Sequence, residues 1–150
     1  MSTLTDDQHR ELASRLNNAA WTLLETPVLD TAQQAELIAL GAAAHHHWHA
    51  VGTEANKAHA DLLLGWAMAR AGVGGPAFHL TERARTFFEE TSAAVWERAF
   101  AEAAASAACH SLGDQAGHAH HARRAAALGS ELVGADANYF RAAFATVPPV

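Results

Sequence analysis

The stretch SAAVWERAFAEAAASAACHSLG, residues 92–113, decides the fold class of this 150-residue chain. Its apolar residues recur at three- and four-residue spacing from Trp96 to Ala107, which is the period of one face of an α-helix. Alanine, the strongest helix former, dominates the stretch. Gly113 then interrupts the pattern, as glycine commonly does just after a helix. The stretch therefore predicts a helix that begins at Ser92 and packs closely against neighbouring helices.

Similar patterns run through the rest of the chain. Half of the residues are apolar and only four are proline, which favours helices over sheet. Capping and breaking residues predict further helix starts at Thr5, at Asp30 or Thr31, at Thr53, near Pro76, at Asp114 and after Gly134. Short connections make successive helices antiparallel neighbours. We therefore expect one all-α domain at residues 1–147, a stack of antiparallel helical hairpins with about seven helices, followed by a disordered tail at residues 148–150.

Charge and composition restrict the partners. A formal net charge of -6 provides no basic stripe for a phosphate backbone, so nucleic acid is not expected as a partner. No apolar stretch is long enough to span a bilayer, and the amino terminus carries no apolar signal-peptide run. Cys109 is the single cysteine, which excludes an internal disulfide and fits a reducing compartment. We expect a soluble cytoplasmic protein that does not bind membranes.

Two segments resemble the tetratricopeptide repeat at its small-residue positions. The first contains Leu64-Gly65-x-x-Met68, Gly72, Ala77, Thr81 and Ala84. The second lies 41 positions further along and contains Ser106, Gly113-Asp114 and Ala125, with His118 in place of the packing alanine. Asp61 and Met68 stand where the repeat has tryptophan and tyrosine, and the spacing exceeds the usual repeat length of about 34 residues.

A longer stretch, from His46 to Ala84, resembles an uncharacterised tetratricopeptide-like family of actinobacteria. The residues that carry the resemblance are His47-Trp48, Val51-Gly52-Thr53 with Asn56, and Pro76-Ala77 with His79. Relatives commonly have proline after the threonine, where this chain has Glu54. The resemblance covers about half of the chain. It implies a stack of helical hairpins and supplies no catalytic residues.

Such a stack suggests a binding function, because stacked hairpins generate a concave surface that commonly binds peptides or proteins. We expect a tetratricopeptide-like binding module for a peptide, a protein partner or a small ligand. Homodimerisation through the first or last helix is also expected, since end repeats leave apolar faces to cover. The aromatic residues are expected to pack between helices. Any aromatic side chain left exposed on the concave surface would instead mark a ligand groove.

Clustered histidines suggest an alternative function. Eleven histidines are present, and imidazole is the commonest protein metal ligand. His110, His118 and His121 fall on predicted inward faces, and His79 lies at the same end of the stack. Converging imidazoles could ligate zinc, copper or iron. The alternative function is therefore a histidine-ligated divalent-metal-binding protein or a small metal-dependent enzyme. The competing interpretation is that these are ordinary hydrogen-bonded histidines at helix ends.

A second candidate cluster lies at the opposite end of the stack. His45 and His49 are one helical turn apart, and His59 approaches from the next helix. No acid lies between His45 and His49 as in His-Glu-x-x-His, so a zinc protease is not predicted. A solvated histidine run beside a packed Trp48 is the competing interpretation. The sequence assigns no catalytic residue, and whether the protein is an enzyme stays open.

Overall fold

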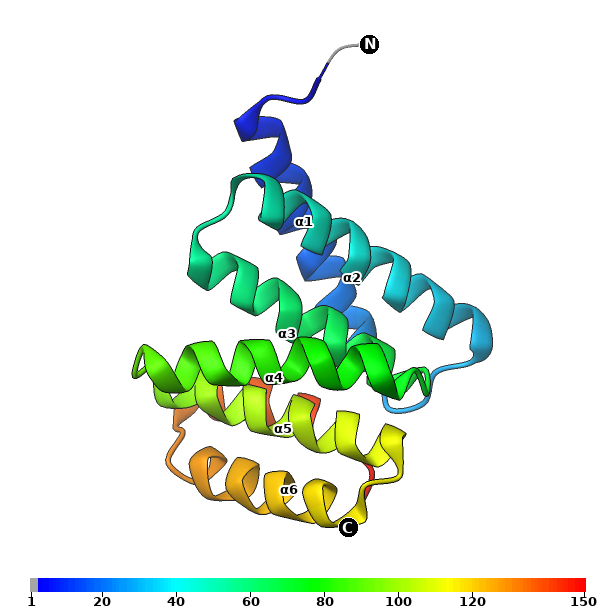
Figure 1. Cartoon of the computed structure of the whole chain (residues 1–150), viewed down its shortest axis with the longest axis vertical. Coiled ribbons are helices and arrows are strands. Elements are labelled where there is room, and N and C mark those ends of the chain that lie inside the picture. The colour runs from blue at the N-terminus through cyan, green and yellow to red at the C-terminus, as the bar shows by residue number, and fades with distance from the viewer. Residues whose placement is uncertain (1–2) are drawn as a thin grey trace.

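The computed structural model describes residues 3–150, and every regular element in that range is an α-helix. The helices are α1 (Asp6–Leu24), α2 (Thr31–Val51), α3 (Glu54–Arg70), α4 (Gly74–Glu90), α5 (Val95–Leu112), α6 (Gln115–Gly129) and α7 (Gly134–Phe144). They follow one another as stacked antiparallel hairpins from the amino-terminal to the carboxy-terminal end (Figure 1). The predicted all-α stack of seven helices is confirmed.

Side-chain caps fix the starts of the first three helices. Thr5, Asp30 and Thr53 each accept a hydrogen bond from the backbone N–H three residues further on, and the side chain of that third residue accepts from the cap's own N–H. Each pair satisfies two donors that a helix start leaves unpaired. Asp114 likewise accepts from the N–H of Gly117 at the start of α6. These starts agree with the sequence prediction.

The start of α5 does not agree. The helix begins at Val95 after Ala94, three residues beyond the predicted start at Ser92. Ser92 has a φ of 49° and lies in the left-handed region. The N–H of Ala93 donates to the carbonyl of Phe88, which closes the last turn of α4. Ser92 therefore terminates α4, a position usually taken by glycine.

The helices form two layers. In the inner layer α1, α3, α5 and α7 contact one another in succession, while α2, α4 and α6 each lie against two consecutive inner helices. Helix α5 lies at the centre, and every residue from Ala101 to Cys109 is buried. Its alanines explain this position, because small side chains let helices approach from several sides at once. The inner layer carries the concave surface.

Helices α3 and α4 approach each other closely at Gly65. A Cβ added there would lie 2.8 Å from Thr81 Cγ2 and 3.1 Å from the carbonyl oxygen of Ala77. In the next hairpin Ser106 stands 41 positions after Gly65, and its hydroxyl lies 2.8 Å from Nδ1 of the buried His118. A hydrogen bond in α5–α6 thus occupies the place of the glycine contact in α3–α4.

The carboxy-terminal residues lie close to His118 of α6. Val147 is buried, and residues 148–150 continue without helical structure. The carbonyl of Pro149 approaches Nε2 of His118 to 3.4 Å. Within residues 3–150 no helix is both long enough and apolar enough to cross a membrane.

Candidate functional site

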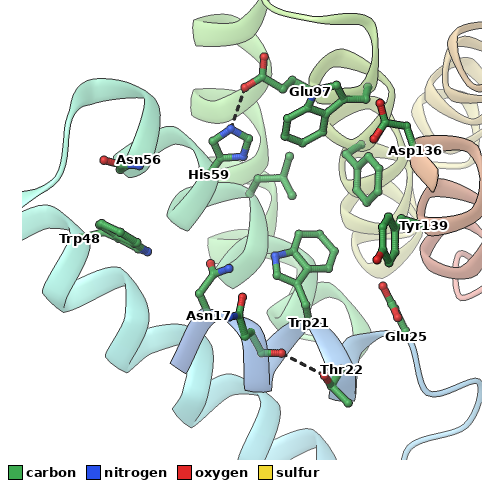
Figure 2. Close-up of a pocket in the computed structure, with 14 residues that line it drawn as sticks. Asn17, Trp21, Thr22, Glu25, Trp48, Asn56, His59, Glu97, Asp136 and Tyr139 are labelled. Carbon is green, nitrogen blue, oxygen red and sulfur yellow. Dashed lines mark hydrogen bonds and ion pairs between the residues drawn. The ribbon is translucent and has the colours of Figure 1, made fainter. Parts of the chain in front are cut away.

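A concave pocket of about 610 Å³ opens on the inner layer (Figure 2). Its walls come from all four inner helices and from the end of α2. The lining residues are Asn17, Asn18, Trp21, Thr22, Glu25, Trp48, Asn56, His59, Leu62, Trp96, Glu97, Phe100, Asp136 and Tyr139. The hairpin stack thus brings together residues that are up to 122 positions apart in the sequence, from Asn17 to Tyr139.

Aromatic rings connect the pocket to the core. Trp21 makes edge-to-face contacts with the buried Trp66 and with Phe100, at centroid distances of 6.0 and 5.6 Å. Trp96 contacts Phe100 in the same way at 6.2 Å. Such contacts hold aromatic rings in fixed orientations. These contacts join the wall of the pocket to the buried core at Trp66.

Three aromatic side chains depart from the expected core packing, namely Trp96, Tyr139 and the 39% exposed Phe78 on α4. Trp66 and Phe88 are buried as expected, whereas Trp96 is 38% exposed and Tyr139 is 62% exposed. Trp96 and Tyr139 both line the concave pocket. The expectation of core packing is therefore wrong for these residues. Trp96 and Tyr139 are exposed on the concave surface, where an exposed aromatic ring is expected to mark a ligand groove.

The rim of the pocket is acidic. Its acidic residues are Glu25, Glu97 and Asp136. Among residues 3–150, no lysine or arginine lines the pocket. Glu97 is held in place, because Oε1 lies 2.8 Å from His59 Nε2 and Oε2 accepts a hydrogen bond from the Ala94 N–H. In Figure 2 Glu25 and Asp136 flank Tyr139 on the opposite side from Trp48.

His59 belongs to this pocket. Its ring stacks on Trp96 at a centroid distance of 5.4 Å and an interplanar angle of 17°. Its Nε2 is engaged with Glu97. The structure therefore does not bring His59 together with His45 and His49, the partners that helix order had suggested.

His45 and His49 instead meet the buried Asp61 on α3. The Nε2 atoms of the two histidines lie 2.8 and 3.2 Å from Asp61 Oδ1, and Arg83 on α4 lies 2.7 Å from Oδ2. Within residues 3–150, these are the residues that bring three potential metal-ligand atoms within 4.8 Å of one another. Burial alone would raise the pKa of Asp61, but the His45 hydrogen bond and the Arg83 charge outweigh it and hold that pKa below its usual value.

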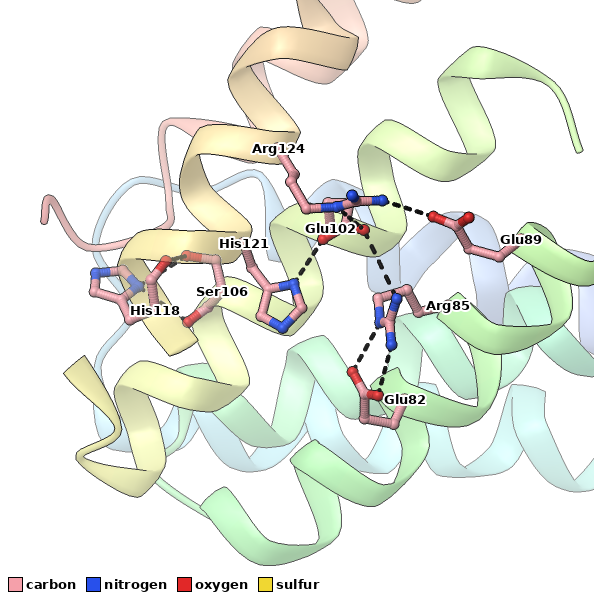
Figure 3. Close-up of polar contacts among 8 residues, drawn as sticks. All are labelled: Glu82, Arg85, Glu89, Glu102, Ser106, His118, His121 and Arg124. Carbon is pink, nitrogen blue, oxygen red and sulfur yellow. Dashed lines mark hydrogen bonds and ion pairs between the residues drawn. The ribbon is translucent and has the colours of Figure 1, made fainter. Parts of the chain in front are cut away.

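The predicted metal-binding set of His79, His110, His118 and His121, here called the lower histidines, does not converge. His118 is buried against Ser106, whereas Nδ1 of His121 lies 2.6 Å from Glu102 Oε2, so the two rings engage different partners (Figure 3). His110 is exposed rather than inward, although its ring centroid lies 5.0 Å from that of His118. His79 is exposed on the outer face of α4 beside Glu82 and Arg83. The described residues form no three-ligand cluster here.

A second polar cluster surrounds Glu102. This residue is buried on α5, and its carboxylate contacts His121 and Arg124 from α6 (Figure 3). Arg124 also bonds to Glu89 on α4. Burial alone would raise the pKa of Glu102, but the hydrogen bonds from His121 and Arg124 lower it below its usual value. The cluster therefore joins three helices around one ionised carboxylate.

Sequence reasoning missed Asp61 and Glu102 as site residues. Each is an isolated acid within a run of apolar residues, and that is the signal that could have identified them, because a buried carboxylate requires partners. The 41-residue offset also relates Asp61 to Glu102 and Arg83 to Arg124. Asp61 forms an ion pair with Arg83, and Glu102 forms the corresponding ion pair with Arg124. A duplicated hairpin would produce this correspondence.

Cys109 has no features of a nucleophile. Burial, followed by the nearby Asp114, raises the pKa of its thiol to about 11. A thiol with such a pKa stays protonated near neutral pH. Its role is packing at the end of α5.

Comparisons with known proteins give no relative. No protein family, curated protein or solved structure matches the chain. The function is therefore inferred from the geometry of its sites.

Proposed function

We propose that this protein is a binding module whose concave pocket takes a peptide segment with an arginine or lysine side chain. The observation that carries the proposal is the combination of exposed aromatic rings and three carboxylates in a pocket of about 610 Å³. That volume falls within the range of ligand pockets.

The aromatic rings and the carboxylates favour a cation together. A cation over the face of a tryptophan or tyrosine gains about 0.5–2 kcal/mol. Tyr139 and Trp96 are 62% and 38% exposed. His59 stacks on one face of Trp96, so a cation would approach Tyr139 or the other face of Trp96. None of the ion pairs among residues 3–150 involves Glu25 or Asp136, so each carboxylate is available for a charged ligand. An anionic ligand would meet these carboxylates with no lining cation to balance them.

The polar residues of the pocket favour a peptide over a bare ion. Asn17, Asn18 and Asn56 line the pocket, and asparagine amides both donate and accept hydrogen bonds. The Asn56 oxygen already accepts from Thr53, so Asn56 offers its N–H groups to a ligand. Peptide backbones offer the matching groups. A peptide therefore accounts for the amides as well as for the acidic and aromatic groups.

Calorimetric titration with blocked pentapeptides tests the proposal. The peptides have an alanine background and a central arginine, lysine, leucine or glutamate. The arginine and lysine peptides should bind at least about tenfold more tightly than the other two, a difference of about 1.4 kcal/mol. Failure of both cationic peptides to bind at millimolar concentration would contradict the proposal. Equally tight binding of tetramethylammonium or guanidinium alone would identify the ligand as a small cation and would also contradict it.

Matched variants locate the binding site. Trp96→Ala should weaken binding of the arginine peptide at least about tenfold, and the double variant Glu25→Gln/Asp136→Asn should do the same. Phe78→Ala is the control, because Phe78 is 39% exposed, almost the same as Trp96 at 38%, but lies on the outer face of α4. An equal loss of affinity in Phe78→Ala would place the ligand elsewhere.

A further inference from the structure

His45 and His49 are arranged around one oxygen atom. They lie on consecutive turns of α2, and their rings stack with a centroid distance of 4.0 Å and an interplanar angle of 25°. Both present Nε2 to Oδ1 of Asp61, which lies on the neighbouring helix α3. Three donor atoms from two helices thus converge on one point.

Charge balance does not require both histidines. Arg83 already contacts Oδ2 of Asp61 at 2.7 Å and can neutralise the carboxylate by itself. The two imidazoles are therefore additional to the ion pair.

The separations are compatible with a metal coordination sphere once the side chains rearrange. Zinc binds imidazole nitrogen at about 2.0–2.1 Å and carboxylate oxygen at similar distances, so tetrahedral ligands lie about 3.3 Å apart. The two Nε2–Oδ1 distances are 2.8 and 3.2 Å. All three ligand atoms lie within 4.8 Å of one another, so a rearrangement of these side chains would let an ion replace the two N–H protons.

The cluster is accessible on one side and fixed on the other. The side chains of His45 and His49 are 24% and 31% exposed, whereas that of Asp61 is 5% exposed. An ion can therefore enter past the two imidazoles, with a water molecule at the remaining position. Arg83 holds Oδ2 and leaves Oδ1 to the two histidines. A second shell orients a carboxylate ligand in this way.

We propose that His45, His49 and Asp61 form a binding site for Zn²⁺, with a fourth position open to water. The three residues supply two nitrogens and one oxygen, a donor set that suits zinc. The site is separate from the peptide pocket and does not depend on the function proposed for that pocket. It also differs from the histidine set suggested by the sequence, because Asp61 takes the place of His59.

Zinc titration of the untagged, chelator-treated protein tests this site. With a competing chromophoric chelator, the wild-type protein should bind one Zn²⁺ per chain at micromolar affinity or better. His49→Ala and Asp61→Asn should each weaken binding at least about tenfold. Co²⁺ provides a second readout, because the tetrahedral site should give a visible absorption band that both variants lose.

Controls within the same histidine run separate the possible sites. His46 is exposed, and Nδ1 of His47 lies 2.9 Å from Nδ1 of His9, away from Asp61. His46→Ala and His47→Ala should therefore retain zinc affinity. Zinc loss in His47→Ala but not in His49→Ala would overturn the proposal, as would binding of less than one zinc per chain. If circular dichroism shows that Asp61→Asn is unfolded, the partly exposed His45→Ala and His49→Ala decide the result.

Discussion

At the residue scale, two buried acids are the most sensitive points of the molecule. Asp61 and Glu102 are almost fully buried, at 4% and 1% exposure, yet both keep a lowered pKa. Removing a carboxylate from water is costly unless cations and hydrogen bonds compensate. The arginines and histidines around each acid provide that compensation. Removing these partners, or the carboxylates themselves, should therefore lower the free energy of unfolding.

Glu102→Gln should lower the free energy of unfolding by about 1.5–3 kcal/mol, because it replaces charge-assisted hydrogen bonds from His121 and Arg124 with neutral ones. Urea denaturation measures the change. Glu89→Gln is the matched control, because Glu89 contacts the same Arg124 but both side chains are more than 40% exposed. It should change stability by no more than about 0.5 kcal/mol. Equal effects in the two variants would contradict the importance of burial.

His118→Ala should lower the free energy of unfolding by about 2–4 kcal/mol, since it opens a cavity and leaves the buried Ser106 hydroxyl without the imidazole. Zinc binding should stay unchanged, because His118 lies outside the proposed metal site. Urea denaturation and zinc titration of the same variant test both statements. Loss of zinc with little loss of stability would instead return the metal site to the lower histidines.

At the element scale, the close contact between α3 and α4 should tolerate no extra methyl group. Gly65→Ala should lower the free energy of unfolding by about 1–3 kcal/mol, because the added Cβ would overlap Thr81 and the Ala77 carbonyl. Gly75→Ala is the control, since a Cβ there meets nothing within 4 Å. It should be neutral or slightly stabilising. A neutral Gly65→Ala in urea denaturation would show that the helices can separate without cost.

Helix starts could be predicted because their signals are local. Thr5, Asp30 and Thr53 each act within three residues, so the sequence alone identifies them. Ser92 was misassigned because a serine in the left-handed region gives the same local pattern as a helix cap. The partners of histidines depend on helix packing, which the sequence does not state. His59 therefore appeared to belong with His45, although its nearest acid is Glu97 in α5.

At the scale of the whole molecule, stability should fall in two stages as pH falls. Burial, together with neighbouring histidines, lowers the pKa of His47 and His49. Below about pH 6.5 the unfolded chain therefore binds protons before the folded chain does, and the free energy of unfolding decreases. The pKa values of Asp61, Glu82 and Glu102 are lowered in the folded chain. Their contribution to the free energy of unfolding is therefore present above about pH 4 and is lost as the pH falls below it.

Thermal unfolding across this pH range measures both stages. The variant His47→Gln/His49→Gln should flatten the decline between about pH 7 and pH 5 and leave the acidic stage in place. His120→Gln is the control, because His120 is exposed. A melting temperature that is constant from about pH 7 to pH 5 in the wild-type protein would contradict the first stage.

The hairpin stack as a whole has one central consequence, the aromatic and acidic pocket on its concave side. Three of the four tryptophans, Trp21, Trp48 and Trp96, line this pocket, whereas Trp66 is fully buried outside the lining. The indole N–H signals in ¹H–¹⁵N NMR spectra therefore report on the pocket and the core separately. Titration with the arginine pentapeptide should shift the signals of Trp21, Trp48 and Trp96 and leave that of Trp66 least affected. No shift at millimolar peptide, or equal shifts of all four signals, would contradict the proposed binding site.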